Sequence, residues 1–237
     1  MIMRSILASM LICGTLFSAP YEPVDASKLM TTQNEGSYVN LPEAFKRIDD
    51  IYLRCRSIPM DFDNKEDEKQ AYLDIQKLQN LLMTLDRQNY VETQPIEISS
   101  AYLLRKARLY ASANGFGVAD AYNKADIFYN FAASEDISNS NIHLEYANYL
   151  GGLGEMDHAK SEFKWALDQG ERKALLGLAI IYSLEGYRDS AIEYLKAFEQ
   201  SYSKNQFTKS LAEEILKGNS TQIDNGIFKH PAYLTNF

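Results

Sequence analysis

Apolar residues recur every three or four positions along most of the chain, which is the spacing of one face of an α-helix. The clearest stripe lies between about residues 64 and 89 and consists of Tyr72, Ile75, Leu78, Leu82 and Leu85. A shorter helix is expected to begin at Leu41-Pro42, because proline suits the first helical positions, and to end near Pro59. Residues 41–98 therefore predict two N-terminal helices, followed by a connector over 91–98.

Residues 99–203 contain three segments with the same skeleton of small and bulky apolar residues. Ala125, Ala159 and Ala191 hold equivalent places in the three segments, 34 and 32 residues apart. This period is typical of a repeat made of two helices joined by a turn. Helices cross closely only where small side chains face each other, so Ala147 is expected to face Ala159, and Ala179 to face Ala191.

Glycines stand where the first helix of a pair must end. Gly154 and Gly186 are expected to terminate these helices, since the residue that reverses the chain there commonly has a positive φ. After the repeats, residues 204–237 are predicted to hold a capping helix, Phe207 to Lys217, and an aromatic tail. The tail either packs back on the repeats or is an exposed docking peptide. Packing is favoured, because exposed apolar tails promote aggregation.

The first repeat segment carries a recognisable motif. Gly115-Phe-Gly117-Val118 is followed by Asp120, Lys124-Ala125, Tyr129 and Ala132-Ala133. This order resembles the Sel1-like repeat family, a branch of the tetratricopeptide superfamily, over roughly residues 100–202. The resemblance implies an all-α fold, a short α-solenoid of antiparallel helix pairs in a Sel1/TPR-like superhelix, with the N-terminal helices and the capping helix at its ends. Lys106 departs from the family pattern, which usually has leucine there.

The N-terminus has the pattern of an export signal. Arg4 is the only charged residue before Glu22, and an apolar run extends from Ser5 to Phe17, the length of a signal-peptide core and too short for a comfortable membrane span. Residues 1–26 are predicted to hold the signal peptide and the start of a leader, and residues 27–40 a flexible leader. Cleavage after Ser18 and cleavage after Ala26 both fit.

Export predicts a periplasmic or secreted protein. A buried N-terminal helix is one alternative. A lipoprotein anchored through Cys13 is another, although the preceding Leu11-Ile12 is a poor lipobox because the position before the cysteine should be small. Membrane attachment is expected only if Cys13 is lipidated.

Composition and motifs argue against catalysis, a metal or cofactor site, and a nucleic-acid or lipid partner. The net charge of −8 disfavours nucleic acid and anionic lipid as partners. The histidines have no metal-ligand spacing, and the acidic residues 61–68 indicate a solvated helix start more than a calcium loop. Cys55 lies between two arginines that would lower its pKa, but it has no partner for nucleophilic catalysis. We expect neither an enzyme nor a cofactor or metal site.

The resemblance to tetratricopeptide stacks implies that a partner contacts the first helix of each pair. The corresponding positions are Leu104, Arg108, Leu144, Asn148, Leu176, Ile180 and Ser183. We therefore expect a periplasmic protein-binding adaptor or scaffold of an envelope assembly. The alternative is a periplasmic immunity protein that binds and neutralises a secreted toxin, for which an acidic surface is suited. In either case the chain's own ends are competing occupants of this face.

Overall fold

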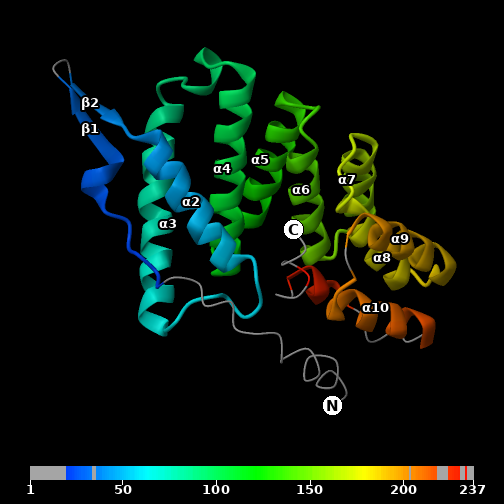
Figure 1. Cartoon of the computed structure of the whole chain (residues 1–237). Coiled ribbons are helices and arrows are strands. Elements are labelled where there is room, and N and C mark those ends of the chain that lie inside the picture. The colour runs from blue at the N-terminus through cyan, green and yellow to red at the C-terminus, as the bar shows by residue number, and fades with distance from the viewer. Residues whose placement is uncertain (1–19, 34–35, 203, 218–223, 230–232, 234–237) are drawn as a thin grey trace. The chain divides into compact units, whose positions relative to one another are not determined.

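The computed structural model describes residues 20–33, 36–202, 204–217, 224–229 and 233 (Figure 1). The core of the predicted signal peptide, Cys13 and His230 lie outside these residues. The chain divides into two compact units, Ser18–Ile137 and a C-terminal unit that contains Ser138–Phe237. Consecutive helices pack against each other within both units, so the chain has the all-α helical-repeat fold that its periodicity predicts.

Helix α4 is the centre of the N-terminal unit. It packs against α2, α3 and α5, and α2 and α3 are the two helices expected before the repeats. A short antiparallel hairpin precedes them, with Met30 opposite Val39. The elements are η1 (Ala26–Leu29), β1 (Met30–Gln33), β2 (Gly36–Val39), α2 (Leu41–Cys55), α3 (Lys65–Asp86), η2 (Val91–Thr93), α4 (Ile96–Gly115) and α5 (Ala121–Glu135).

Side chains of the sequence fix where α2 and α3 begin. The Asn40 side chain accepts a hydrogen bond from the backbone of Glu43, and Pro42 lies in the first turn of α2, as expected. The Asn64 side chain accepts from the backbone amides of Glu66 and Asp67 and so caps α3. The acidic residues here therefore belong to a helix start, where negative charge complements the helix dipole.

The described leader residues, 20–33 and 36–40, are ordered rather than flexible, which corrects the expectation for them. Tyr21, Val24 and Leu29 are buried. The Tyr21 hydroxyl and the Val24 backbone amide both donate to Asp74 Oδ2, each at 2.8 Å. Asp74 is itself fully buried on α3. A buried carboxylate needs several donors, and the leader supplies two of them, so these residues belong to the folded unit.

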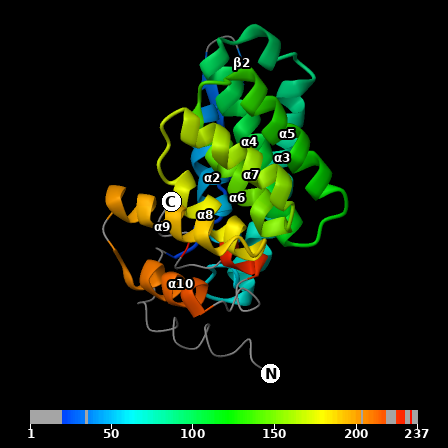
Figure 2. The same cartoon turned by 90° about the vertical axis from the view of Figure 1, so that its right-hand side faces the viewer.

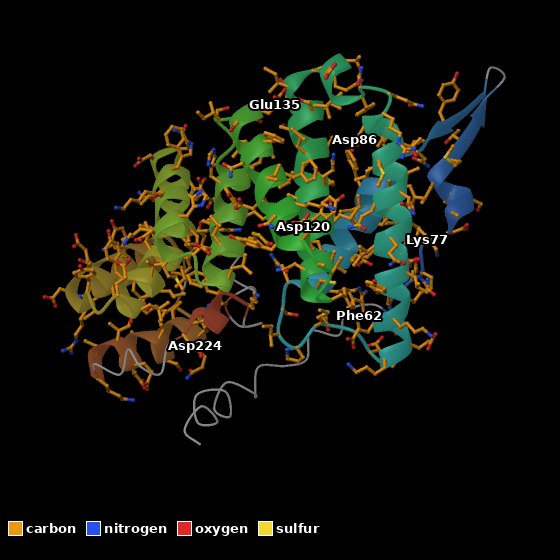
Figure 3. All side chains as sticks on the ribbon, turned by 180° about the vertical axis from the view of Figure 1, so that it is seen from behind. Phe62, Lys77, Asp86, Asp120, Glu135 and Asp224 are labelled. Carbon is orange, nitrogen blue, oxygen red and sulfur yellow. The ribbon has the colours of Figure 1, made fainter. Side chains whose placement is uncertain are left out.

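Lys77 completes this cluster from the same helix. Its Nζ donates to Asp74 Oδ1 at 2.8 Å, while the side chain remains about half exposed (Figure 3). Gln70 donates to the same oxygen at 2.9 Å. Burial and the hydrogen bond to Asp74 raise the pKa of Tyr21 well above its ordinary value. The phenol therefore stays protonated and keeps donating to the carboxylate across the physiological range.

The C-terminal unit contains the second and third predicted helix pairs. Gly154 and Gly186 follow α6 and α8 with φ of 89° and 83°, the left-handed conformation that the sequence predicts there. The four alanines expected to face each other are fully buried, and the helices that carry them pack in pairs. The elements are α6 (Ser140–Leu153), α7 (Met156–Asp168), α8 (Ala174–Leu184), α9 (Arg188–Ser201), α10 (Gln206–Lys217) and η4 (Asn225–Lys229).

Candidate partner-binding surfaces

The two predicted partner-contacting positions of the N-terminal unit, Leu104 and Arg108, are engaged within the unit itself. Leu104 is buried on α4. Arg108 is half-buried, and its Nη1 contacts Asp49 Oδ1 of α2 at 2.6 Å. Arg105 reaches the other oxygen of Asp49 at 3.0 Å. The cationic side chain expected to contact a partner therefore holds an N-terminal helix of the same chain.

The corresponding positions of the C-terminal unit are also covered. The Asn148 Oδ1 atom accepts a hydrogen bond from the hydroxyl of Tyr233, a residue of the C-terminal tail. The remaining positions are buried in the described structure, namely Leu144, Leu176, Ile180 and Ser183. The described tail residues Phe228 and Tyr233 are buried, so this part of the tail packs on the repeats, as favoured from the sequence. Partner binding at these positions stays a prediction, and it requires the chain's own segments to move.

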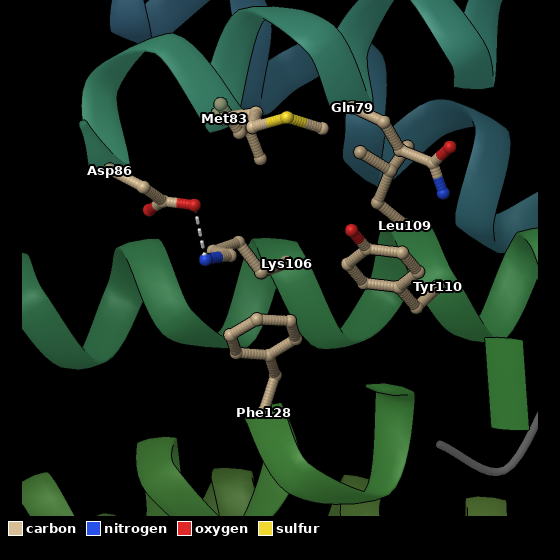
Figure 4. A pocket seen from close by; sticks show the side chains of 8 residues that line it. Gln79, Met83, Asp86, Lys106, Leu109, Tyr110 and Phe128 are labelled. Atoms are coloured by element: carbon tan, nitrogen blue, oxygen red, sulfur yellow. Dashed lines mark hydrogen bonds and ion pairs between the residues drawn. The ribbon is translucent and has the colours of Figure 1, made fainter. Parts of the chain in front are cut away.

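A different surface of the N-terminal unit is open. A groove lies along α4 between α3 and α5, and we call it the α3–α5 groove (Figure 4). It encloses about 300 Å³ when the open space at its mouth is included. The enclosed part of this space is only about 60 Å³, well below the range for small-molecule pockets, so the groove suits side chains of a partner better than a cofactor. It is lined by Gln79, Leu82, Met83, Asp86, Lys106, Leu109, Tyr110 and Phe128.

An ion pair closes one end of the groove. Lys106 Nζ lies 2.7 Å from Asp86 Oδ2. The same ammonium lies 3.9 Å from the centre of the Phe128 ring. The Tyr102 hydroxyl donates to the other oxygen of Asp86 at 2.8 Å. A buried lysine is tolerated only with such partners, since carboxylate and ring face together replace its lost water.

Aromatic side chains form the floor and one wall. The rings of Tyr110 and Phe128 stack with centroids 5.5 Å apart. Burial, and then the charge of Asp86, raise the pKa of Tyr110, so its hydroxyl remains a hydrogen-bond donor. Among the described residues, neither the Tyr110 hydroxyl nor the Gln79 amide has a hydrogen-bond partner, and both line the groove. The groove thus combines an apolar wall with polar groups that have bonding capacity left.

Exposed apolar side chains extend this surface. Met83 on α3 is 43% exposed, and Phe131 and Ile127 on α5 are 56% and 47% exposed. Phe131 contacts Phe128 edge-on, with ring centroids 6.5 Å apart. The sequence pattern predicts no site here. The one signal was Lys106, which departs from the leucine of the repeat pattern and forms the ion pair at the end of the groove.

The remaining candidate groups are enclosed by the fold. Cys55 is buried, and burial raises the pKa of its thiol to about 12, so its flanking arginines do not activate it. His143 of α6 is buried, and its Nδ1 lies 2.6 Å from Glu162 Oε2 of α7. Among the described residues, no group of three His, Cys, Asp or Glu side chains is arranged to hold a metal ion. No helix in this part of the chain is long and apolar enough to cross a membrane.

Comparison with protein-family models, curated proteins and solved structures finds no match to this chain. The resemblance to Sel1-like repeats therefore rests on the quoted residues, and membership of that family stays a prediction.

Proposed function

We propose that the chain is an exported, non-enzymatic adaptor or scaffold of an envelope assembly that binds a protein partner through the α3–α5 groove. The observation that carries this proposal is the exposure of Met83 and Phe131 beside the Tyr110–Phe128 stack. Single exposed apolar residues need no explanation, whereas exposed apolar residues on both sides of one groove favour an interaction surface. Methionine and aromatic residues are also the types enriched at protein interfaces.

The partner is a basic amphipathic helix. Residues 18–137 contain 13 Lys and Arg against 19 Asp and Glu. Several of these cations are already held by acidic groups of the same unit, among them Arg105, Arg108 and Lys106. The resulting negative field attracts a basic partner and raises its association rate. A groove between two helices with apolar side chains along it is the usual receptor for the apolar face of a helix.

The cellular setting of the proposal comes from the sequence. The N-terminal charge pattern supports export, and the resemblance to Sel1-like repeats supports an adaptor in the cell envelope. An immunity protein that neutralises a secreted toxin is the alternative, and it uses the same acidic surface. The identity of the partner decides between them.

One substitution in the groove tests the proposal. Met83→Glu places a charge on its wall, whereas Thr84→Glu adds the same charge to the next residue of α3, which is exposed and does not line the groove. Each full-length chain is used as bait against an envelope fraction. We expect wild type and Thr84→Glu to retain a basic partner, and Met83→Glu to lose it, with about a tenfold or greater loss of affinity on titration with that purified partner.

Two further results decide the proposal and its alternative. Equal retention of every partner by wild type and Met83→Glu, with both chains folded by circular dichroism, contradicts groove binding. A component of an envelope assembly supports the adaptor. A toxin, together with protection of cells that co-express the chain, establishes the immunity alternative instead.

A further inference from the structure

The C-terminal tail lies against α6 through two aromatic side chains. Phe228 of η4 is 1% exposed and Tyr233 is fully buried. Their rings meet edge-on with centroids 5.3 Å apart, and Phe228 also stacks on Phe163 of α7. The short η4 lies beside α6 (Figures 1 and 2). The tail is therefore seated in a defined place on the α6–α7 pair.

Two adjacent glycines of α6 make room for it. A Cβ atom on Gly151 would lie 2.9 Å from the Phe228 ring, and one on Gly152 would lie 2.7 Å from Lys229 Cε. Both glycines are inside α6 and lie outside the group of glycines with positive φ, so no turn requires them. Each glycine inside a helix costs about 0.5–1 kcal/mol relative to alanine. This loss of helix stability is the cost of leaving space on α6 for the Phe228 ring.

One residue of the tail is unfavourable at this position on α6. Lys229 follows Phe228 directly and is half-buried against Gly152. Burial lowers the pKa of its ammonium, because the charged form loses water when the tail docks. A segment with the same aromatic groups and an uncharged side chain at this place would avoid that desolvation.

We propose that the surface of Asn148, Gly151, Gly152 and Phe163, the tail-binding surface, is a second protein-binding site for a partner segment that presents two aromatic side chains. The chain's own tail fills it until such a segment takes its place. This site lies in the C-terminal unit and is separate from the α3–α5 groove. A tethered tail competes at an effective concentration of the order of millimolar, so it excludes weak ligands and yields to strong or abundant ones.

A synthetic peptide with the sequence of residues 224–237 tests this proposal on the full chain. The double variant Phe228→Ala, Tyr233→Ala leaves the surface empty, and fluorescence anisotropy measures binding of the labelled peptide. We expect the double variant to bind it at least about tenfold more tightly than wild type. A peptide with methionine in place of Lys229 should bind more tightly still. Adding Gly151→Leu to the double variant should abolish binding, whereas adding Ser161→Leu, at an exposed position of α7, should not.

A measurement on a chain without these substitutions keeps the proposal testable if the double variant does not fold. A fluorinated phenylalanine at position 228 reports the seat of the tail by ¹⁹F NMR. Excess peptide should move its signal to that of the unfolded chain. The tethered tail is present at an effective concentration of the order of millimolar, so free peptide above about 10 mM should displace it. A signal that does not move at this peptide concentration overturns the proposal. Equal peptide affinity of a folded double variant and wild type also overturns it, and either result leaves the α3–α5 groove unaffected.

Discussion

The two units cover the first helix of their repeats in different ways. In the N-terminal unit, α4 is covered by the whole of α2, and Asp49 joins the two helices through Arg105 and Arg108. In the C-terminal unit, α6 is covered by the short η4, which rests on Gly151 and Gly152, and by Tyr233, whose hydroxyl donates to Asn148. The first cover is a long helix held by charges. The second is a few residues held by aromatic rings.

This difference indicates which face can be exchanged for a partner. A helix of 15 residues that belongs to a core shared with α3 and α4 leaves only when the unit unfolds. A tail attached through two rings and a hydroxyl can leave while the helix pair beneath it stays folded. We therefore propose that the N-terminal unit binds a partner at its outer α3–α5 groove, and the C-terminal unit at the surface under its tail.

The largest effect is expected from shortening the leader. A chain that begins at Ser27 lacks Tyr21 and Val24 and leaves Asp74 without two of its donors. Loss of two buried side chains, at about 1.5–3 kcal/mol each, amounts to about 3–6 kcal/mol, and the lost hydrogen bonds add to it, so the free energy of unfolding should fall by at least about 4 kcal/mol. Urea unfolding of chains beginning at Ala19 and at Ser27 measures the difference.

The same comparison selects between the two predicted cleavage sites. If the chain is exported, its mature form should begin at Ala19, after Ser18, because cleavage after Ala26 removes part of the core. Mass spectrometry of the exported protein determines the first residue. Glu22→Ala is the control for the leader, since this side chain is mostly exposed and should change stability by less than about 1 kcal/mol.

The repeats could be predicted from the sequence because the same constraint occurs several times. Ala147 and Ala159, and then Ala179 and Ala191, are small for the same reason, and Gly154 and Gly186 end equivalent helices. The leader could not be predicted in this way. Tyr21 and Asp74 are 53 residues apart, and nothing near either one indicates that they meet. Polar composition alone favoured a flexible leader, whereas tertiary burial determines its structure.

The α3–α5 groove and the tail-binding surface could not be predicted from local sequence patterns either. Phe128 and Phe131 have the spacing of a core stripe, and only the packed helices reveal that Phe128 is half-buried and Phe131 exposed. Gly151 and Gly152 are two glycines inside a helix pattern, and the ring that requires the first of them comes from a residue 77 positions later. Sequence periodicity identifies which residues face a helix partner. It does not identify which later segment covers the opposite face.

A smaller loss of stability should follow from removing the polar contact that holds α2 on α4, or the one that holds the tail on α6. Asp49→Ala leaves two arginines of α4 without their carboxylate, and hydrogen bonds to charged groups contribute about 1.5–3 kcal/mol, so we expect a loss of about 2–3 kcal/mol. Asn148→Ala removes a neutral bond to Tyr233 and should cost about 1 kcal/mol. Denaturant unfolding of both variants measures this contrast, and a larger loss for Asn148→Ala would contradict it.

Substitution of two helical glycines tests whether the tail is packed as firmly as the core. Gly177 lies against a core ring, and Gly151 lies against a ring of the tail. A Cβ on Gly177 would lie 2.3 Å from Phe163, a fully buried ring of α7, so Gly177→Ala should destabilise the unit by about 1–3 kcal/mol. Gly151→Ala meets the Phe228 ring, which can leave with the tail. Ordering the tail costs conformational entropy that offsets much of what its rings contribute, and the alanine adds about 0.5–1 kcal/mol of helix propensity, so the free energy of unfolding should fall by less than in Gly177→Ala.

Hydrogen exchange distinguishes the two outcomes at the residues concerned. Gly151→Ala should lose protection in residues 225–229 while α6 and α7 keep theirs. If Gly151→Ala destabilises the unit as much as Gly177→Ala does, the tail is as firmly packed as the core, and the two covers do not differ.

The smallest expected effect is a pH dependence that belongs to the tail alone. Lys229 has a lower pKa when docked than when free, so docking disfavours its charged form. Below the lowered pKa the full penalty applies. As pH rises from the lowered pKa to the ordinary lysine value, the penalty falls to zero and docking tightens.

Lys229→Met keeps an unbranched apolar stem over Gly152 and has no charge, so its tail should dock more tightly at neutral pH and lose this dependence. The ¹⁹F signal at position 228, followed from pH 7 to 10, measures both, and an identical pH response in wild type and Lys229→Met would show that another group sets the behaviour of the tail.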